Sequence, residues 1–185
     1  MKKNPIFLLL LLLVQIIILS SLIPITKCDD NDEDEDLITK ICKETPLESL
    51  CLSTLQPISD LPNIDTKVLA NFMATTVLKN ATDNLNYIEG LIKQTPDPQQ
   101  ERALADCAEL YIPVVKYVLP QAIEALSRGH YGFAKYNIAD VGKQADNCEK
   151  GFSGSSAKSP LTDRNKLVRN LSDIVVAIIN VLVKG

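Results

Sequence analysis

Few residues in this chain of 185 could support catalysis. Its single histidine, His130, would have to serve as the base of any Ser-His-Asp or Cys-His site. No nucleophile motif lies near His130, which falls where a turn between two helices is predicted. Carboxylates such as Asp140 and Asp146 lie at helical spacing on a polar face, where they are usually solvated. The residue types therefore predict a protein that acts through its surface and is not an enzyme.

Sites for a metal, a cofactor or nucleic acid are also missing from the sequence. The cysteines are spaced for disulfide bridges, without the close Cys/His pairs of a zinc site. No glycine-rich phosphate loop occurs. Binding to nucleic acid needs a basic stripe that displaces counterions from phosphate, and the chain has none. We expect no metal, no cofactor and no nucleic-acid partner.

The N-terminus has the layout of a secretory signal peptide. Lys2 and Lys3 precede an apolar run over residues 6–25, and a polar stretch follows. The alternative is an uncleaved anchor, because the run approaches the roughly 20 residues that span a bilayer. The proline and small polar residues near its end favour cleavage, and no other segment is apolar enough to cross a membrane. We expect a protein secreted to the apoplast or cell wall, with the vacuole as the alternative.

Cysteine parity indicates where the signal peptide ends. An odd number of cysteines would leave a free thiol in an oxidising compartment, whereas cleavage just after Cys28 leaves four. The prediction is a signal peptide over residues 1–28, although a cut after Ser21 stays open. Residues 29–36 carry seven acidic side chains and predict a disordered, solvated tail, with a grip on a basic partner as the alternative. The chain from Leu37 onward is balanced, with 16 basic and 16 acidic residues.

Residues 37–185 are predicted to form one all-α domain. Apolar residues recur at steps of three and four, and no strand pattern occurs. Pro113 and Pro120 predict kinks, Gly129 predicts a helix C-cap, and Thr45 is expected to cap a helix that begins at Pro46. Four long helices with short connections predict an up-down-up-down bundle preceded by a helical hairpin. The expected helices are 37–43, 46–55, 65–94, 99–128, 131–148 and a last one from about residue 160 to the C-terminus.

The cysteine positions test this arrangement. Cys107 and Cys148 each lie about 20 residues from the turn at Gly129, so two antiparallel helices hinged there would bring them level. Four cysteines allow three pairings. This geometry favours Cys107–Cys148, which leaves Cys42–Cys51 as the second bridge, across the N-terminal hairpin.

The order of these features resembles the plant invertase and pectin methylesterase inhibitor family. The resemblance extends from about Leu37 to Val183, and it is specific because each cysteine keeps its neighbouring residues. It implies a helical hairpin extending from a four-helix bundle, with the same two bridges. The matching segments are Ile41–Pro46, Cys51–Leu55, Leu104–Tyr111, Ala122–Leu126 and Asp146–Phe152.

The resemblance implies a secreted inhibitor that occludes the active-site cleft of a cell-wall carbohydrate enzyme, bound 1:1 and without a cofactor. Invertase inhibitors resemble the chain over residues 119–126, and usually continue with Pro-Lys-Phe at the following turn. Here Tyr131, Gly132 and Phe133 take those positions, so only the phenylalanine is kept. The pattern over residues 146–152 is similar to pectin methylesterase inhibitors. We therefore favour pectin methylesterase as the partner, with acid invertase (β-fructofuranosidase) as the alternative.

The expected partner-binding residues are donors and rings near the predicted turn. The two aromatic rings at 133 and 136 have core packing as the alternative. Two sequons, at Asn80 and Asn170, are candidate glycosylation sites. A non-inhibitory helical ligand carrier or structural protein, an enzyme pro-region and a cryptic enzyme using His130 stay open as other functions. The candidate binding residues are His130, Tyr131, Phe133, Lys135, Tyr136 and Asp140.

Overall fold

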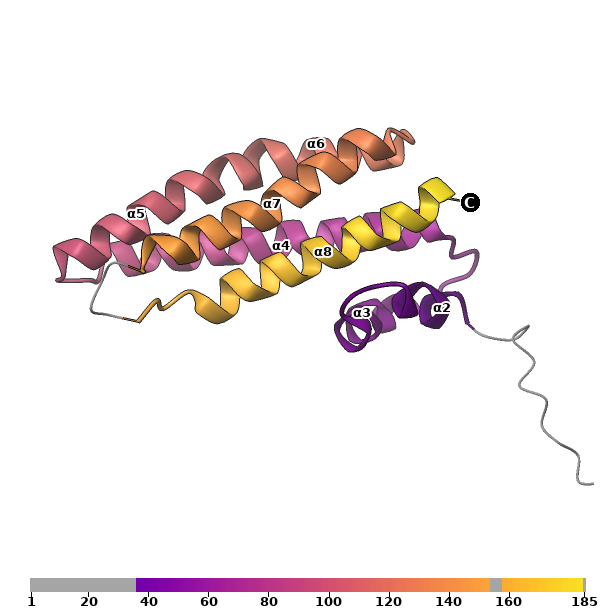
Figure 1. The fold of residues 1–185 in the computed structure, drawn as a ribbon, viewed down its shortest axis with the longest axis horizontal. Coiled ribbons are helices and arrows are strands. Elements are labelled where there is room, and N and C mark those ends of the chain that lie inside the picture. Colours follow the sequence, from indigo (N-terminus) through magenta and orange to yellow (C-terminus); the bar gives the residue numbers. More distant parts are fainter. Residues whose placement is uncertain (1–35, 154–157, 185) are drawn as a thin grey trace, which may run out of the picture. The chain divides into compact units, whose positions relative to one another are not determined.

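The computed structural model describes residues 36–153 and 158–184. The predicted signal peptide 1–28, with Cys28 in it, lies outside these residues. So does the acidic segment, except for Asp36. Within the described residues every regular element is a helix (Figure 1), as the spacing of apolar residues predicts.

Four antiparallel rods form the main body of the described chain. Their elements are α4 (Thr66–Ile92), α5 (Pro98–Pro113), η2 (Val114–Val118), α6 (Leu119–Ser127), α7 (Tyr131–Gly151) and α8 (Thr162–Lys184). The second rod is the continuous run α5–η2–α6, which packs against both α4 and α7, while α8 packs against the same two helices (Figure 1). This arrangement confirms the predicted up-down-up-down bundle.

Local sequence explains where these helices begin. The side chain of Asp65 accepts a hydrogen bond from the backbone N–H of Val68 at 2.7 Å and caps α4. Asp97 accepts from the backbone N–H of Gln99 at 3.0 Å and caps α5. Each cap satisfies one of the free donors at a helix start. The helices predicted to begin at residues 65 and 99 each begin within one residue of those positions.

The kinks expected at Pro113 and Pro120 take the form of a π-helical turn between the two prolines, η2. A π turn contains more residues than an α turn, so it shifts the buried face along the sequence. Burial accordingly passes from Val114 to Leu119. Val115 and Val118, which a regular spacing of three and four residues places on the buried face of this helix, are only half-buried, so that spacing does not hold here.

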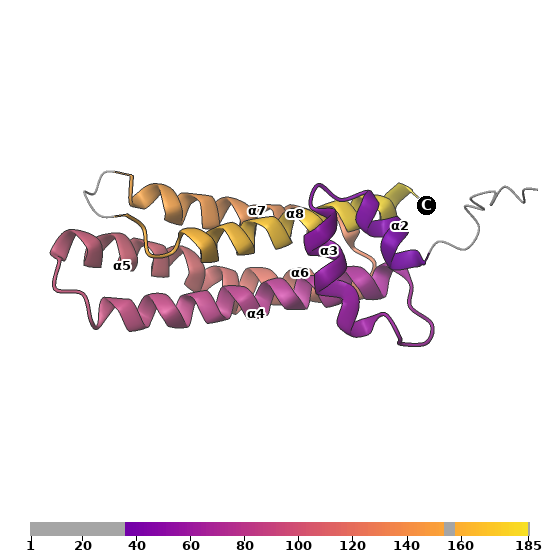
Figure 2. The same ribbon diagram turned by 90° about the horizontal axis from the view of Figure 1, so that it is seen from below.

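The N-terminal hairpin consists of α2 (Leu37–Lys43) and α3 (Glu48–Leu55), followed by the short 3-10 turn η1 (Gln56–Ile58). It packs against α4 and α8 (Figure 2). The second helix begins at Glu48 and not at Pro46 as predicted. The hydroxyl of Thr45 donates to the carbonyl of Cys42 at 2.7 Å, so it closes the turn after α2 and does not cap α3.

Both predicted disulfides are present. Cys107 on α5 and Cys148 on α7 are bonded, with their Cα atoms 4.7 Å apart, which confirms that the two helices run level from the turn at Gly129. Cys42 and Cys51 are bonded across the hairpin, with their Cα atoms 5.5 Å apart. Both bridges are buried. One therefore joins two rods of the bundle, and the other holds together two helices too short to be stable alone.

A buried polar cluster adjoins the Cys107–Cys148 bridge. The hydroxyl of Tyr111 on α5 donates to Oδ1 of Asn165 on α8 at 2.9 Å, and Nδ2 of Asn84 on α4 donates to the same oxygen at 3.1 Å. Nδ2 of Asn165 donates to Glu149 on α7 at 3.0 Å. Burial raises the pKa of Tyr111 well above its ordinary value. The cluster thus links all four rods through directional bonds.

Candidate functional site

The turn between α6 and α7 is held by a complete set of backbone hydrogen bonds. The N–H of Gly129 donates to the carbonyl of Leu126 at 3.1 Å, and the N–H of His130 donates to the carbonyl of Ala125 at 2.8 Å. These two bonds define a Schellman motif, which requires the positive φ of 79° found at Gly129. The turn therefore presents its side chains from a fixed backbone.

The end of α6 is also tied to its neighbour in the bundle. The hydroxyl of Ser127 donates to Oδ1 of Asn71 on α4 at 3.1 Å and to the carbonyl of Ile123 at 3.1 Å. The first bond joins α6 to α4 immediately before the turn. The turn is thus supported from two sides, by its own backbone and by α4.

A shallow hollow of about 300 Å³ lies beside this turn. Charged, amide and aromatic groups meet there, which gives the hollow the chemistry of a recognition surface and not of a catalytic site. No serine, threonine, cysteine or lysine side chain lines it. Its lining residues are Gln121, Glu124, Ala125, Arg128, His130 and Phe133.

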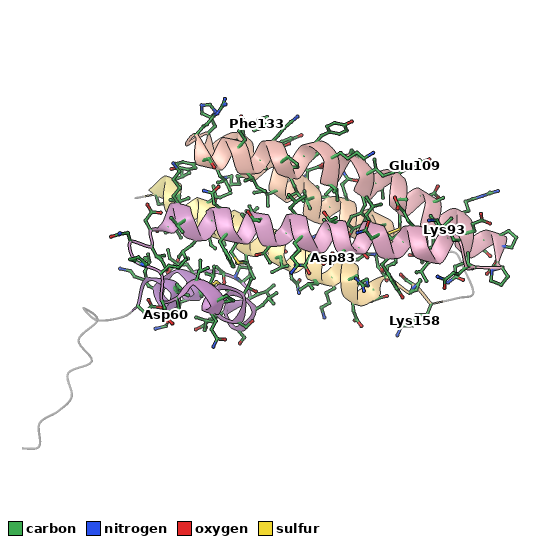
Figure 3. All side chains as sticks on the ribbon, turned by 180° about the vertical axis from the view of Figure 1, so that it is seen from behind. Asp60, Asp83, Lys93, Glu109, Phe133 and Lys158 are labelled. Atoms are coloured by element: carbon green, nitrogen blue, oxygen red, sulfur yellow. A yellow bond between two sulfur atoms is a disulfide. The ribbon has the colours of Figure 1, made fainter. Side chains whose placement is uncertain are left out.

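Two aromatic rings near the turn face solvent. Phe133 is 53% exposed and Tyr136 is 72% exposed, so neither belongs to the core, which was the alternative for both rings. Figure 3 places Phe133 at one end of the bundle, opposite Lys93 and Lys158. Large exposed rings on a rigid element can bind a partner with little loss of conformational entropy.

The other predicted residues are less available. Tyr131 is half-buried and packs against the core. Lys135 donates from Nζ to Oδ1 of Asn180 on α8 at 3.2 Å, and Oδ2 of Asp140 accepts from Nε2 of Gln144 at 3.2 Å. The structure therefore brings His130 and Phe133 together at the hollow, and it leaves Tyr131, Lys135, Tyr136 and Asp140 outside its lining.

Arg128 and Glu124 are two members of this surface that the sequence analysis did not single out. Nη2 of Arg128 lies 2.7 Å from Oε1 of Glu124, one helical turn away, and both side chains are largely exposed. The spacing of four residues just before a C-cap glycine was a usable indication of this pair. The positively charged side chain of Arg128 thus lines the hollow, although Arg128 lies outside the turn residues 130–133 that the sequence indicated.

The two sequons lie within helices. Asn80 is half-buried, its Nδ2 donates to the carbonyl of Thr76 at 2.8 Å, and it lines an open hollow between α3 and α4. Asn170 is half-buried, and Ser172 two residues later is fully buried. Glycosylation at either asparagine stays a prediction.

Across the ranges 36–153 and 158–184, no group of three or more His, Cys, Asp or Glu side chains is arranged to hold a metal ion. No helix in these ranges has both the length and the apolar character of a membrane span.

Comparison with known proteins supplies the family. A family model described as plant invertase/pectin methylesterase inhibitor matches residues 36–178. A protein from Arabidopsis thaliana, the cell wall/vacuolar inhibitor of fructosidase 1, is 37% identical over 142 residues, which cover 77% of this chain and 67% of that protein. A pectinesterase inhibitor from Actinidia deliciosa is 28% identical over 160 residues, or 86% of each chain.

A solved structure agrees on the fold. The crystal structure of a mutant form of a pectin methylesterase inhibitor from Arabidopsis superposes with a TM-score of 0.69 at 22% identity. The superposition covers 79% of this chain and 97% of the other. The two proteins share the helical architecture.

Proposed function

The chain belongs to the plant invertase/pectin methylesterase inhibitor family, and from this membership we propose that it inhibits an acid invertase, a β-fructofuranosidase. Its family makes it an enzyme inhibitor and not an enzyme. The observation that carries the choice of target is the 37% identity to an inhibitor of fructosidase, against 28% to a pectinesterase inhibitor.

Pectin methylesterase is the second candidate target. The sequence pattern over residues 146–152 favours it, and so does a pectinesterase inhibitor that aligns over 86% of this chain. The sequence favours this target both by that pattern and because the turn lacks the Pro-Lys-Phe run. The higher identity over most of the chain outweighs a difference confined to three residues.

Inhibition would work by occlusion of the active-site cleft. The α6–α7 turn has a fixed backbone and loses little conformational entropy on docking, which favours a tight 1:1 complex. Its exposed ring at Phe133 and its polar neighbours suit a cleft built to bind sugars, where rings and carboxylates line the surface. The partner-binding surface comprises His130, Phe133 and Tyr136, with Tyr131, Lys135 and Asp140 as supporting residues.

Secretion follows from the same proposal. The relative from Arabidopsis thaliana is named a cell wall/vacuolar inhibitor, which supports an extracellular or vacuolar location for this chain. The predicted signal peptide over residues 1–28 would direct the protein into that pathway. The four remaining cysteines would then pair fully in an oxidising compartment.

The test is a titration of the purified mature protein against a plant acid invertase and, in parallel, a plant pectin methylesterase. We expect invertase activity on sucrose to fall linearly and to reach its minimum at one inhibitor per enzyme. Inhibition of the esterase alone would replace the first target by the second. Full activity of both enzymes from about pH 4 to 7 would refute the proposal.

A further inference from the structure

The hollow between α3 and α4 shares no lining residue with the hollow at the α6–α7 turn. Its volume is about 580 Å³, and sites that bind small molecules typically hold roughly 300–1,000 Å³. The N-terminal hairpin forms one side of it through Ser53, Thr54 and Pro57, and α4 forms the other. It is therefore a separate surface with room for a ligand of moderate size.

We propose that Asn80 carries an N-linked glycan in the secreted protein, and that this glycan lies in the hollow between α3 and α4 and holds the hairpin against the bundle. The inference rests on secretion, which is part of the proposed function, and not on the identity of the target. Asn80 begins the sequon Asn80-Ala81-Thr82 and is itself one of the residues that line the hollow. The attachment point of the sugar thus lies inside the surface that would receive it.

The transfer of the glycan takes place on Nδ2 of Asn80. A bond forms between Nδ2 and C1 of the first sugar, and the bond between C1 and the pyrophosphate of a lipid-linked oligosaccharide breaks. Nδ2 loses one of its hydrogens as a proton, which balances the negative charge gained by the released lipid pyrophosphate. The other hydrogen stays, so Nδ2 can keep donating to the carbonyl of Thr76, which lies 2.8 Å away. The glycosylated side chain can therefore keep the position that the structure gives it.

The orientation of Asn80 directs the glycan along α4. Asn80, Thr76 and Phe72 are four residues apart and lie on one face of this helix. Nδ2 of Asn80 lies at the carbonyl of Thr76, toward the N-terminal end of α4. Phe72 is one turn further in the same direction, about 12 Å from Asn80 along the helix axis, and its half-buried ring lines the hollow. Sugar units beyond the first would therefore meet this ring.

The hydroxyl groups of the hollow are arranged to accept hydrogen bonds. Oγ of Ser53 and Oγ1 of Thr54 donate to the carbonyl of Leu50, at 3.1 and 2.6 Å. Thr75 and Thr76 donate from Oγ1 to carbonyls of α4, at 2.9 and 3.0 Å. A hydroxyl has one proton and two lone pairs, so these oxygens are left as acceptors. A sugar supplies the matching donors through its O–H groups and the N–H of an acetamido group.

The hollow also offers apolar surface and charged groups. Pro57 on η1 and Phe72 on α4 line it, and the C–H face of a sugar ring can cover both. Lys79 is exposed in the hollow and can donate to an acetamido carbonyl, while Asp83, labelled on α4 in Figure 3, adds an acceptor. Because these two charges have opposite signs, the hollow suits a neutral sugar chain better than a charged polymer.

A glycan in this position would join the hairpin to the bundle. The helices α2 and α3 are too short to be stable alone, and apolar side chains such as Leu55 and Ile58 hold them on α4 and α8 (Figure 2). A sugar chain bonded to Asn80 on α4 and in contact with Ser53 and Pro57 adds contacts across this interface. Added contacts slow the local opening of an element. The glycan would thus act as a clamp on the hairpin.

The experiment uses the full mature protein secreted from plant cells. Mass spectrometry of its peptides measures the glycan on Asn80, which we expect to find. Hydrogen exchange is then compared before and after an amidase releases N-linked glycans, and with Asn80→Gln, which receives none. Exchange over α3 and η1 should become on the order of 3- to 10-fold faster in both forms, as for the loss of about one or two hydrogen bonds. Exchange in α5 and α7 should not change.

Two further variants assign the effect to this sequon and to this hollow. Asn170→Gln is the matched control, because it removes the second sequon, on α8, and should leave exchange in α3 as in wild type. Phe72→Leu keeps an apolar side chain but removes the ring from the hollow. In this variant, release of the glycan should accelerate exchange in α3 less than it does in wild type, because part of the contact is already lost.

The outcomes separate this proposal from the proposed function. An unmodified Asn80 in the secreted protein would overturn the proposal. Hairpin exchange that is the same with and without the glycan, or that accelerates equally in α5 and α7, would overturn it too, and so would an equal effect of Asn170→Gln. A chain that is not secreted would refute secretion and this proposal together. The titration against the two enzymes, run on the same samples, tests inhibition independently of the glycan.

Discussion

The hydroxyl of Tyr111 lies 2.9 Å from Oδ1 of Asn165, and this bond joins α5 to α8 in the interior of the bundle. Asn84 of α4 donates to the same oxygen, so one buried amide is held by two helices. Glu149 of α7 accepts from the other end of that amide. Because polar groups in a core must find partners, this cluster constrains the relative positions of the four rods.

The first prediction concerns this hydroxyl. Tyr111→Phe removes a buried donor but leaves Asn165 Oδ1 bonded to Asn84, so the loss should be moderate. We expect the free energy of unfolding to fall by about 1–2 kcal/mol. Urea denaturation measures it. Tyr117→Phe, at an exposed tyrosine, is the control and should leave stability unchanged. Equal stability of the two variants would show that the buried bond contributes nothing.

The second prediction concerns stability in acid. Burial by itself would raise the pKa of Glu149, but hydrogen bonds from Thr162, Asn165 and Ser159 outweigh it and lower the pKa below its ordinary value of 4.5. A lowered folded-state pKa stabilises the protein above 4.5, and this contribution is lost as the pH falls through the lower, folded value. The contribution of Glu149 to stability is therefore fully present above pH 4.5.

Glu149→Gln tests this sign. The variant should be less stable than wild type near pH 6, and the difference should shrink as the pH approaches about 3, because protonation removes the same charge from wild type. Denaturant melts across this range measure both curves. Glu109→Gln, at an exposed glutamate on α5, should run parallel to wild type. A constant gap between Glu149→Gln and wild type would contradict the assignment.

Much of the fold could be predicted because its determinants are local. Asp65 and Asp97 cap their helices within the next three residues, and Gly129 closes a turn that only a positive φ allows. Cys107 and Cys148 lie at similar distances on either side of that turn, so in a bundle with short connections they come level and pair with each other. Capping and periodicity depend on residues close together in the sequence, and the disulfide spacing depends only on the lengths of the helices.

The errors arose where burial depends on three-dimensional packing. The π turn between Pro113 and Pro120 moved burial to Val114 and Leu119, a shift that no α-helical period contains. At the site, packing decides whether Phe133 and Tyr136 are exposed or buried, because this depends on which face of α7 meets α8. The ion pair of Arg128 with Glu124 follows from helical spacing, but only the structure shows that both residues line the hollow.

The third prediction compares the two disulfides. A bridge stabilises mainly by restricting the unfolded chain, and more so for longer loops. Cys107 and Cys148 are 41 residues apart, whereas Cys42 and Cys51 are 9 apart. Replacing the first pair by alanine should lower the free energy of unfolding by about 4 kcal/mol, and replacing the second by about 2.5 kcal/mol.

Removal of the two disulfides should also destabilise different parts of the protein. Without Cys107–Cys148 the cooperative melt of the whole bundle should move, while without Cys42–Cys51 amide exchange should accelerate first in α2 and α3. Denaturant melts and hydrogen exchange by mass spectrometry distinguish these effects. Exchange that rises equally throughout the second variant would mean that the hairpin and the bundle unfold as one unit.

The last prediction contrasts two glycines with open space around them. A Cβ atom at Gly129 or at Gly90 would have no neighbour within 4 Å, so sterics with other residues favour neither site. Gly129 has a positive φ of 79°, which alanine adopts at a cost, whereas Gly90 lies inside α4, where alanine is the better helix former. We expect Gly129→Ala to destabilise the protein by about 1 kcal/mol and Gly90→Ala to stabilise it by about 0.5–1 kcal/mol. Thermal melts measure both changes in stability.

Only Gly129→Ala should also weaken inhibition of the target, because the backbone that presents Arg128 and Phe133 turns at this residue. Equal inhibition by both variants would show that the turn does not set the binding surface.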